Sequence, residues 1–105
     1  MSEPVVVTAY FHPAEGQHER VVEGLRASIP AVHEEPGCLL YAIHDAPDGT
    51  IVMIEKWESA ELLDRHGAGE PVVELNRRLA GLLAEPVAVT RLAPLAAGTP
   101  GQGAL

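Results

Sequence analysis

Short apolar stretches alternate with amphipathic stretches along the chain, and their spacing predicts four strands and three helices. The strands have a period of two and many β-branched residues, and we expect them at residues 5–11, 38–45, 51–58 and 87–92. The helices repeat their apolar positions every three or four residues, and we expect them at residues 17–33, 60–66 and 71–84. Pro30 falls within the first helix, where it is expected to kink the helix or to begin a separate last turn.

The stretch over residues 50–59 is the most informative part of this pattern. It begins as a continuous apolar run that is too short for a stable helix, so it predicts a strand buried on both faces. One face of this strand carries Ile51, Met53, Glu55 and Trp57. A carboxylate and the only tryptophan of the chain on the same face of a central strand predict the floor of a pocket.

The order of the elements predicts the fold. The turn at residues 45–49 is short, so the strands on either side of it are expected to form an antiparallel hairpin. The order β-α-β-β-α-β is typical of an α+β ferredoxin-like fold, in which helices cover one face of an antiparallel sheet. The other face is too apolar to meet water, so we expect a second copy to cover it in a two-fold homodimer. The domain is expected to span residues 1–92, and residues 93–105 to form a flexible tail.

Charge and composition narrow the possible partners of a 105-residue chain. The formal net charge of -8 disfavours binding to nucleic acid or to anionic membranes. No apolar run approaches the roughly 20 residues that cross a bilayer, and the start at residues 1–4 lacks the features of a leader. The single cysteine, Cys38, excludes an internal disulfide and fits a reducing compartment. We therefore expect a cytoplasmic protein.

Several short motifs resemble a known family. They are Glu35-Pro36-Gly37-Cys38-Leu39 with Tyr41, Ile51-Val52-Met53-Ile54-Glu55, Trp57-Glu58-Ser59 and His66. In this order and spacing they resemble the antibiotic biosynthesis monooxygenase family, and within it most closely the quinol monooxygenases. The resemblance extends from Val5 to about Leu92. It implies a dimeric α+β barrel of two ferredoxin-like subunits, each with a pocket between sheet and helices.

The resemblance also implies a reaction, the oxidation of a quinol or polycyclic phenol by molecular oxygen without a metal or flavin cofactor. A deprotonated, electron-rich phenol can itself reduce oxygen, so the protein supplies a dry slot and a proton acceptor. Family membership does not fix the chemistry. Two alternatives therefore stay open, a non-catalytic dimer that binds a small hydrophobic ligand, and another reaction such as isomerisation of a small metabolite. Haem degradation is not expected, because that branch has an asparagine where residues 8–11 lie here.

Five residues are candidates for the site. His66 is the candidate base, because histidine can take a phenolic proton near neutral pH. Trp57 stands where the family has its pocket tryptophan, and it is expected to stack on a flat aromatic substrate. Glu55, Tyr41 and Tyr10 are candidates for binding substrate hydroxyls.

Each candidate also has a purely structural interpretation. Trp57 can be a core aromatic with its N–H bonded to backbone, and His66 can interact with a helix dipole. Glu55 can orient His66, but an ion pair with Arg65 or Arg91 is the favoured expectation. The tyrosines can fill the barrel. No metal is expected, since the remaining histidines lack zinc-like spacing, and the break at residues 67–69 predicts a shorter or more mobile lid.

Overall fold

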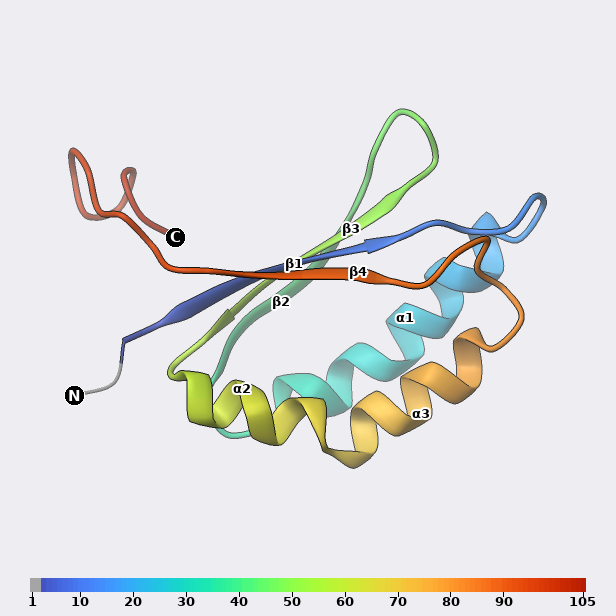
Figure 1. The fold of residues 1–105 in the computed structure, drawn as a ribbon, viewed down its shortest axis with the longest axis horizontal. Helices are drawn as coiled ribbons and strands as arrows, with labels where there is room; N and C mark the ends of the chain where they lie inside the picture. Colours follow the sequence, from blue (N-terminus) through green and yellow to red (C-terminus); the bar gives the residue numbers. More distant parts are fainter. Residues whose placement is uncertain (1–2) are drawn as a thin grey trace.

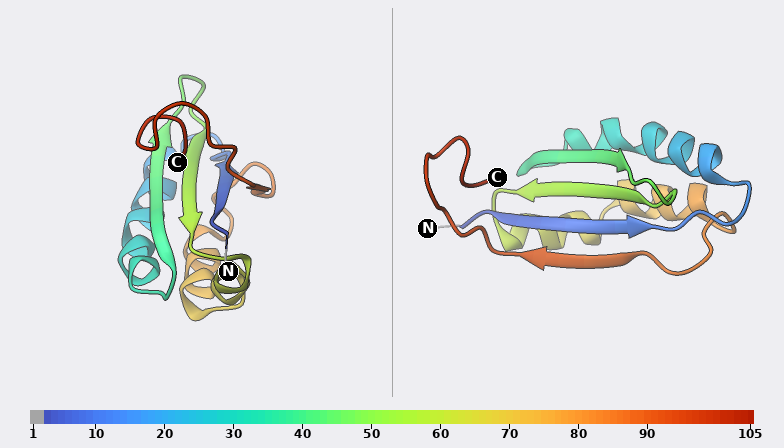
Figure 2. Two further views of the ribbon diagram at one scale, coloured as in Figure 1. Left: turned by 90° about the vertical axis from the view of Figure 1, so that its left-hand side faces the viewer. Right: turned by 90° about the horizontal axis from the view of Figure 1, so that it is seen from above.

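The computed structural model describes residues 3–105 and forms a four-stranded antiparallel sheet with helices on one face (Figures 1 and 2). The elements in chain order are β1 (Val5–Phe11), α1 (His18–His33), β2 (Cys38–Asp45), β3 (Ile51–Trp57), α2 (Ala60–Gly67), α3 (Glu70–Leu79) and β4 (Ala88–Leu92). The strand order is β2-β3-β1-β4. This arrangement confirms the predicted ferredoxin-like α+β fold. Among residues 3–105, no helix is long and apolar enough to cross a membrane.

The register of the sheet brings distant residues into one row. Val7 pairs with Glu55 on one side and with Arg91 on the other, and Glu55 pairs in turn with Tyr41. Directly paired residues point to the same face of a sheet, so these four side chains cross all four strands on the face that the helices cover. The sequence pattern placed Glu55 on a buried face, and the register adds its neighbours.

The core fills the space between this face and the helices. The largest side chains with no solvent exposure include Trp57 and Met53 from β3 and Leu25 from α1. Burying each such side chain contributes roughly 1.5–3 kcal/mol to folding. The helices are therefore fixed to the sheet by apolar packing, and the cavity described below lies in a gap within this layer.

The predicted end of the third helix needs correction. The helix expected at residues 71–84 ends as α3 at Leu79, because the chain leaves the helical conformation at Ala80, with ψ 125°, and Gly81 follows with φ +78°. Leu82 and Leu83 pack against the core from the loop instead, and Leu83 forms an isolated bridge with Pro13. In α1, the helix runs through Pro30 to His33 as one element, so no separate last turn begins at the proline, and the alternative of a kink stays a prediction.

The segment after β4 turns on the side of the sheet away from the helices (Figure 1). Two backbone hydrogen bonds close its turn, from the N–H of Gly103 to the carbonyl of Thr99 and from the N–H of Ala97 to the carbonyl of Gly103. Leu95 is 88% exposed. The flexibility expected for residues 93–105 stays a prediction.

Candidate functional site

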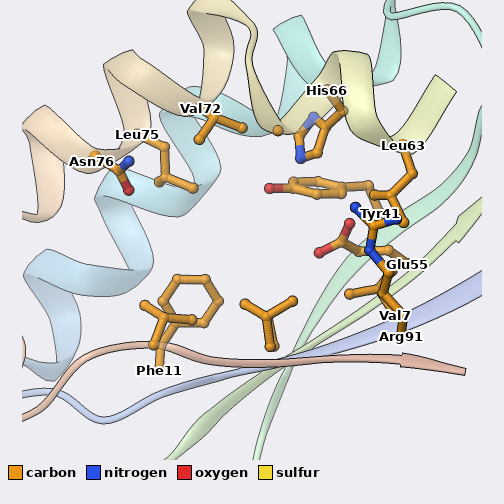
Figure 3. Close-up of a pocket in the computed structure, with 14 residues that line it drawn as sticks. Val7, Phe11, Tyr41, Glu55, Leu63, His66, Val72, Leu75, Asn76 and Arg91 are labelled. Carbon is orange, nitrogen blue, oxygen red and sulfur yellow. The ribbon is translucent and has the colours of Figure 1, made fainter. Parts of the chain in front are cut away.

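A cavity of about 230 Å³ lies between the sheet and the helices α2 and α3 (Figure 3). Its lining consists of Val7, Ala9, Phe11, Tyr41, Glu55, Leu63, His66, Gly67, Val72, Leu75, Asn76, Val87, Val89 and Arg91. Most of these side chains are apolar. The polar exceptions that are buried are Tyr41, Glu55 and His66, which gather at one end of the cavity. The arrangement suits a ligand with an apolar body and polar groups at one end.

The position of His66 follows from the sequence of α2. Ser59 caps this helix, since its side-chain oxygen accepts a hydrogen bond of 3.2 Å from the backbone N–H of Leu62. Helical spacing then places Leu63 and His66 on the same side, and both are buried. The imidazole ring lies against the indole of Trp57, with ring centroids 4.5 Å apart, and meets Tyr41 edge-on at 5.4 Å. The ring is therefore held in place from two sides.

A carboxylate that sequence reasoning missed fixes the orientation of this ring. Nδ1 of His66 lies 2.7 Å from Oε1 of Glu35, which follows α1 in the turn before β2. An ionised carboxylate only accepts hydrogen bonds, so an ionised Glu35 requires Nδ1 of His66 to be the donor in this contact. The ring is turned so that a nitrogen faces the cavity (Figure 3). His66 is thus arranged to accept a proton from a ligand.

The signal for Glu35 was weak in the sequence. Glu35-Pro36-Gly37 was interpreted as the end of a helix and as part of a family motif, with no partner assigned to the carboxylate. The contact joins residues 31 positions apart, so only the packing of α2 beside the turn creates it. Glu55 does not bond to the His66 ring, because Glu35 occupies Nδ1, and its expected role in binding a substrate hydroxyl stays a prediction.

Glu55 is a buried carboxylate in the cavity wall. It is 6% exposed, and its Oε1 accepts a hydrogen bond of 2.9 Å from the indole N–H of Trp57. Burial raises the pKa of the Glu55 carboxyl above its ordinary value, although the Trp57 hydrogen bond and the nearby His66 ring partly oppose this. The carboxyl group points into the cavity, where it can meet a ligand hydroxyl (Figure 3).

The ion pair expected between Glu55 and Arg65 or Arg91 is wrong. Arg91 of β4 contributes to the cavity lining and pairs with Asp64 of α2 at 2.7 Å. Arg65 lies on the exposed side of α2, where its nearest carboxylate is Glu61 at 3.9 Å. The partner of the Glu55 carboxylate is instead the indole N–H of Trp57, which lies on the same face of β3.

Tyr41 brings a hydroxyl to the same end of the cavity. Its side chain is buried, and the hydroxyl points into the cavity (Figure 3). Burial raises the pKa of the Tyr41 phenol, and the negative charges of Glu55 and Glu35 raise it further. The phenol therefore stays protonated near neutral pH and can donate a hydrogen bond to a ligand oxygen.

Two of the predicted residues lie outside the cavity lining. Trp57 has no exposed surface, and it touches the site through His66 and Glu55 rather than through a ligand-facing ring. Its N–H is bonded to a carboxylate, not to backbone as one expectation had it. Tyr10 pairs with Val52 and Ala88 on the face away from the helices and is 39% exposed. The structure thus brings together His66, Tyr41 and Glu55, with Trp57 behind them and Tyr10 elsewhere.

The junction between α2 and α3 borders the cavity, and the shorter or more mobile lid expected there stays a prediction. The break predicted at residues 67–69 is confirmed, since α2 ends at Gly67 and α3 begins at Glu70. Gly67 and Val72 contribute to the lining from either side of this junction. Within residues 3–105, no group of three or more His, Cys, Asp and Glu side chains is placed to hold a metal ion.

Comparisons with known proteins found a matching family and similar solved structures. A sequence model of the family described as antibiotic biosynthesis monooxygenase matches residues 4–78. A Mycobacterium tuberculosis protein named "Putative monooxygenase Rv0793" is 34% identical over 96 residues, which are 90% of this chain and 95% of that protein. Its solved structure superimposes with a TM-score of 0.83, at 33% identity, over 92% of this chain and 100% of that one.

Two further solved structures have a similar fold. The crystal structure of PA3566 from Pseudomonas aeruginosa has a TM-score of 0.82 at 32% identity, and the match covers 91% of this chain and 98% of that chain. A protein from Nitrosomonas europaea, described as a putative antibiotic biosynthesis monooxygenase, has a TM-score of 0.83 at 18% identity, over 90% and 93% of the two chains. At that identity the likeness shows the fold alone.

Proposed function

The chain belongs to the antibiotic biosynthesis monooxygenase family, and on that premise we propose that it oxidises a small quinol with molecular oxygen, without metal or flavin. The observation that carries the proposal is the orientation of His66, whose Nδ1 is bonded to Glu35 while its ring faces a cavity with mostly apolar walls. A base beside an apolar slot is what the activation of a phenol requires.

The size of the cavity supports a ligand of one or two rings. An apolar cavity of about 150 Å³ is enough to bind benzene, whereas pockets for drug-sized ligands begin at about 300 Å³. The cavity here, at about 230 Å³, lies between these values. We therefore favour a benzohydroquinone or naphthohydroquinone over the larger polycyclic phenols that the family resemblance also allowed.

The proposed chemistry begins with proton transfer. A ring hydroxyl of the quinol gives its proton to Nε2 of His66, and the phenolate transfers one electron to oxygen. The resulting superoxide and semiquinone radical combine at a ring carbon that carries hydrogen. That carbon then loses its proton as the O–O bond breaks and water leaves. The sum is hydroquinone plus oxygen giving hydroxyquinone plus water, which balances without an external reductant.

The other polar groups have complementary tasks in this proposal. The protonated Tyr41 donates a hydrogen bond to the oxygen on which negative charge develops, and this favours the phenolate. Glu55 accepts a hydrogen bond from a second hydroxyl of the quinol. Trp57 acts indirectly, since its indole supports the His66 ring and its N–H holds Glu55.

Oxygen consumption by metal-stripped protein tests the proposal. The substrates are benzohydroquinones, naphthohydroquinones and anthrones, and labelled oxygen gas reports whether one oxygen atom enters the product. A positioned general base contributes roughly 10²–10⁴-fold, so His66→Ala is expected to lower kcat at least about 100-fold. His18→Ala is the matched control, because this more exposed histidine lies outside the cavity lining.

Four results would count against the proposed monooxygenase reaction. Uptake that is equal in His66→Ala would remove the proposed base, and formation of hydrogen peroxide without label in the product would indicate an oxidase instead. Saturable binding of quinols with no protein-dependent uptake would favour the alternative of a binding dimer. Conversion of a small polar metabolite without oxygen would favour an isomerase.

A further inference from the structure

We propose that Glu35 is a positioning residue, which keeps the proton of the neutral His66 ring on Nδ1 and so presents Nε2 as the base. The inference rests on the proposed function and assigns a role to a carboxylate that does not line the cavity. The Glu35 side chain is 17% exposed and the His66 side chain 8%, and Oε1 of Glu35 lies 2.7 Å from Nδ1 of His66. The partner of one imidazole nitrogen determines which nitrogen carries the proton, so a half-buried carboxylate at Nδ1 decides the tautomer.

The contact is supported on the Glu35 side by the backbone around it. The N–H of Glu35 donates to the carbonyl of Val32, and its carbonyl accepts from the N–H of Cys38, so the turn is fixed at both ends. Gly69 leaves room for the second carboxylate oxygen. A Cβ atom at Gly69 would lie 3.2 Å from Oε2 of Glu35 and 3.3 Å from the carbonyl oxygen of Arg65. The absence of a side chain at Gly69 therefore leaves space for the Glu35 carboxylate.

The charge of Glu35 also serves the proposed reaction. When Nε2 takes a proton the ring becomes an imidazolium, and a charge-assisted hydrogen bond to the carboxylate favours that form. The groups that face the ring are Glu35 at Nδ1, Trp57 against one side and Tyr41 at its edge, with Glu55 beyond them. Glu35 is the carboxylate that the hydrogen bond joins directly to the ring.

Nitrogen-15 NMR of histidine-labelled protein tests the inference without any substrate. At a pH where the ring is neutral, we expect His66 in the parent protein to show the Nδ1–H tautomer. Glu35→Ala should move the population toward the Nε2–H tautomer, which an unconstrained imidazole favours. Glu35→Asp keeps the charge but is shorter by one methylene, so it should have the same effect and serves if the alanine variant does not fold. Glu34→Ala, a change at the exposed neighbouring carboxylate, should leave the spectrum unchanged.

Steady-state oxygen consumption supplies the second measurement. Loss of the orienting carboxylate is expected to lower kcat at least about tenfold while KM changes little, since the cavity lining is kept. A His66 tautomer that is unchanged in both Glu35 variants would overturn the inference, even if the variants are less stable. Absence of oxygen uptake in the parent protein would contradict the proposed function alone, because the NMR result stands independently of it.

Discussion

Glu55 shows how a single buried group links stability to the chemistry of the site. Its native pKa is raised by burial, so the folded state holds this proton more tightly than the unfolded state does. The protonated form of Glu55 therefore contributes to the free energy of unfolding below the ordinary pKa of a glutamate. This contribution is lost as the pH rises through the pKa of Glu55 in the folded protein. The hydrogen bond from Trp57 offsets part of this loss. A position that costs stability near neutral pH is better explained by ligand binding than by folding.

Substitution Glu55→Gln is expected to change the pH dependence of stability in a defined direction. Glutamine keeps an oxygen that can accept the Trp57 N–H bond but cannot ionise. The free energy of unfolding of the variant minus that of the parent protein should therefore rise between pH 4 and pH 7. Urea unfolding followed by the fluorescence of the single tryptophan measures it. Glu58→Gln, at an exposed site next to Trp57, should give a flat difference, and a difference that falls with pH would contradict the interpretation.

The residues of the site differ in how far the sequence could predict them. The period of β3 was sufficient to place Glu55 on a buried face, and the extent of the second predicted helix was sufficient to place His66 in its last turn. Local patterns could not place Glu35 against His66, because that contact depends on how α2 packs beside the turn after α1. For the same reason the sequence could not show that Trp57 would lie behind His66 and leave Tyr41 to face the cavity.

At the scale of the elements, the turn between α1 and β2 determines where Glu35 lies. Gly37 has φ +84°, and a Cβ atom there would lie 2.5 Å from Cδ1 and 2.9 Å from Cβ of Leu62 in α2. The carbonyl of Gly37 accepts a hydrogen bond of 2.9 Å from the N–H of Glu58, which follows β3. The turn is therefore packed tightly against the start of α2. Pro36-Gly37 predicted a turn from sequence, but not its close contact with a second helix.

Gly37→Ala is expected to lower the free energy of unfolding by about 2–4 kcal/mol. The left-handed backbone costs about 1 kcal/mol for a residue with Cβ, and the overlap with Leu62 adds about 1–3 kcal/mol. Gly16→Ala is the matched control, since Gly16 has φ +76° but no atom within 4 Å of the added Cβ, and it should lose only about 1 kcal/mol. Urea unfolding measures both. Equal losses in the two variants would show that the contact with Leu62 carries no energy.

At the scale of the whole molecule, the helices cover only one face of the sheet (Figure 2). The register places His44 and Lys56 on the opposite face among mostly apolar or small residues, which include Thr8, Tyr10, Ala42, Val52 and Ile54. Most of these residues are at least partly exposed, and the whole of β4 is exposed as well. An apolar sheet face of this kind is typically covered by a partner, and we propose a second copy that packs face to face in a two-fold homodimer. The segment after β4, which turns toward this same side, is placed to contact that partner (Figure 1).

Sedimentation equilibrium of the parent protein and of Ile54→Glu tests the homodimer. Ile54 lies on β3, an inner strand of the sheet, so the substitution places a charge inside the expected interface, once from each subunit. Burial of an unpaired charge costs several kcal/mol, and at 1.4 kcal/mol per tenfold change the dimer should weaken at least about 100-fold. Val73→Glu introduces the same charge at a valine of α3 that is 45% exposed on the helical side, and it should leave the dimer intact. A monomeric parent protein, or an Ile54→Glu variant that still dimerises, would show that this face is not the interface.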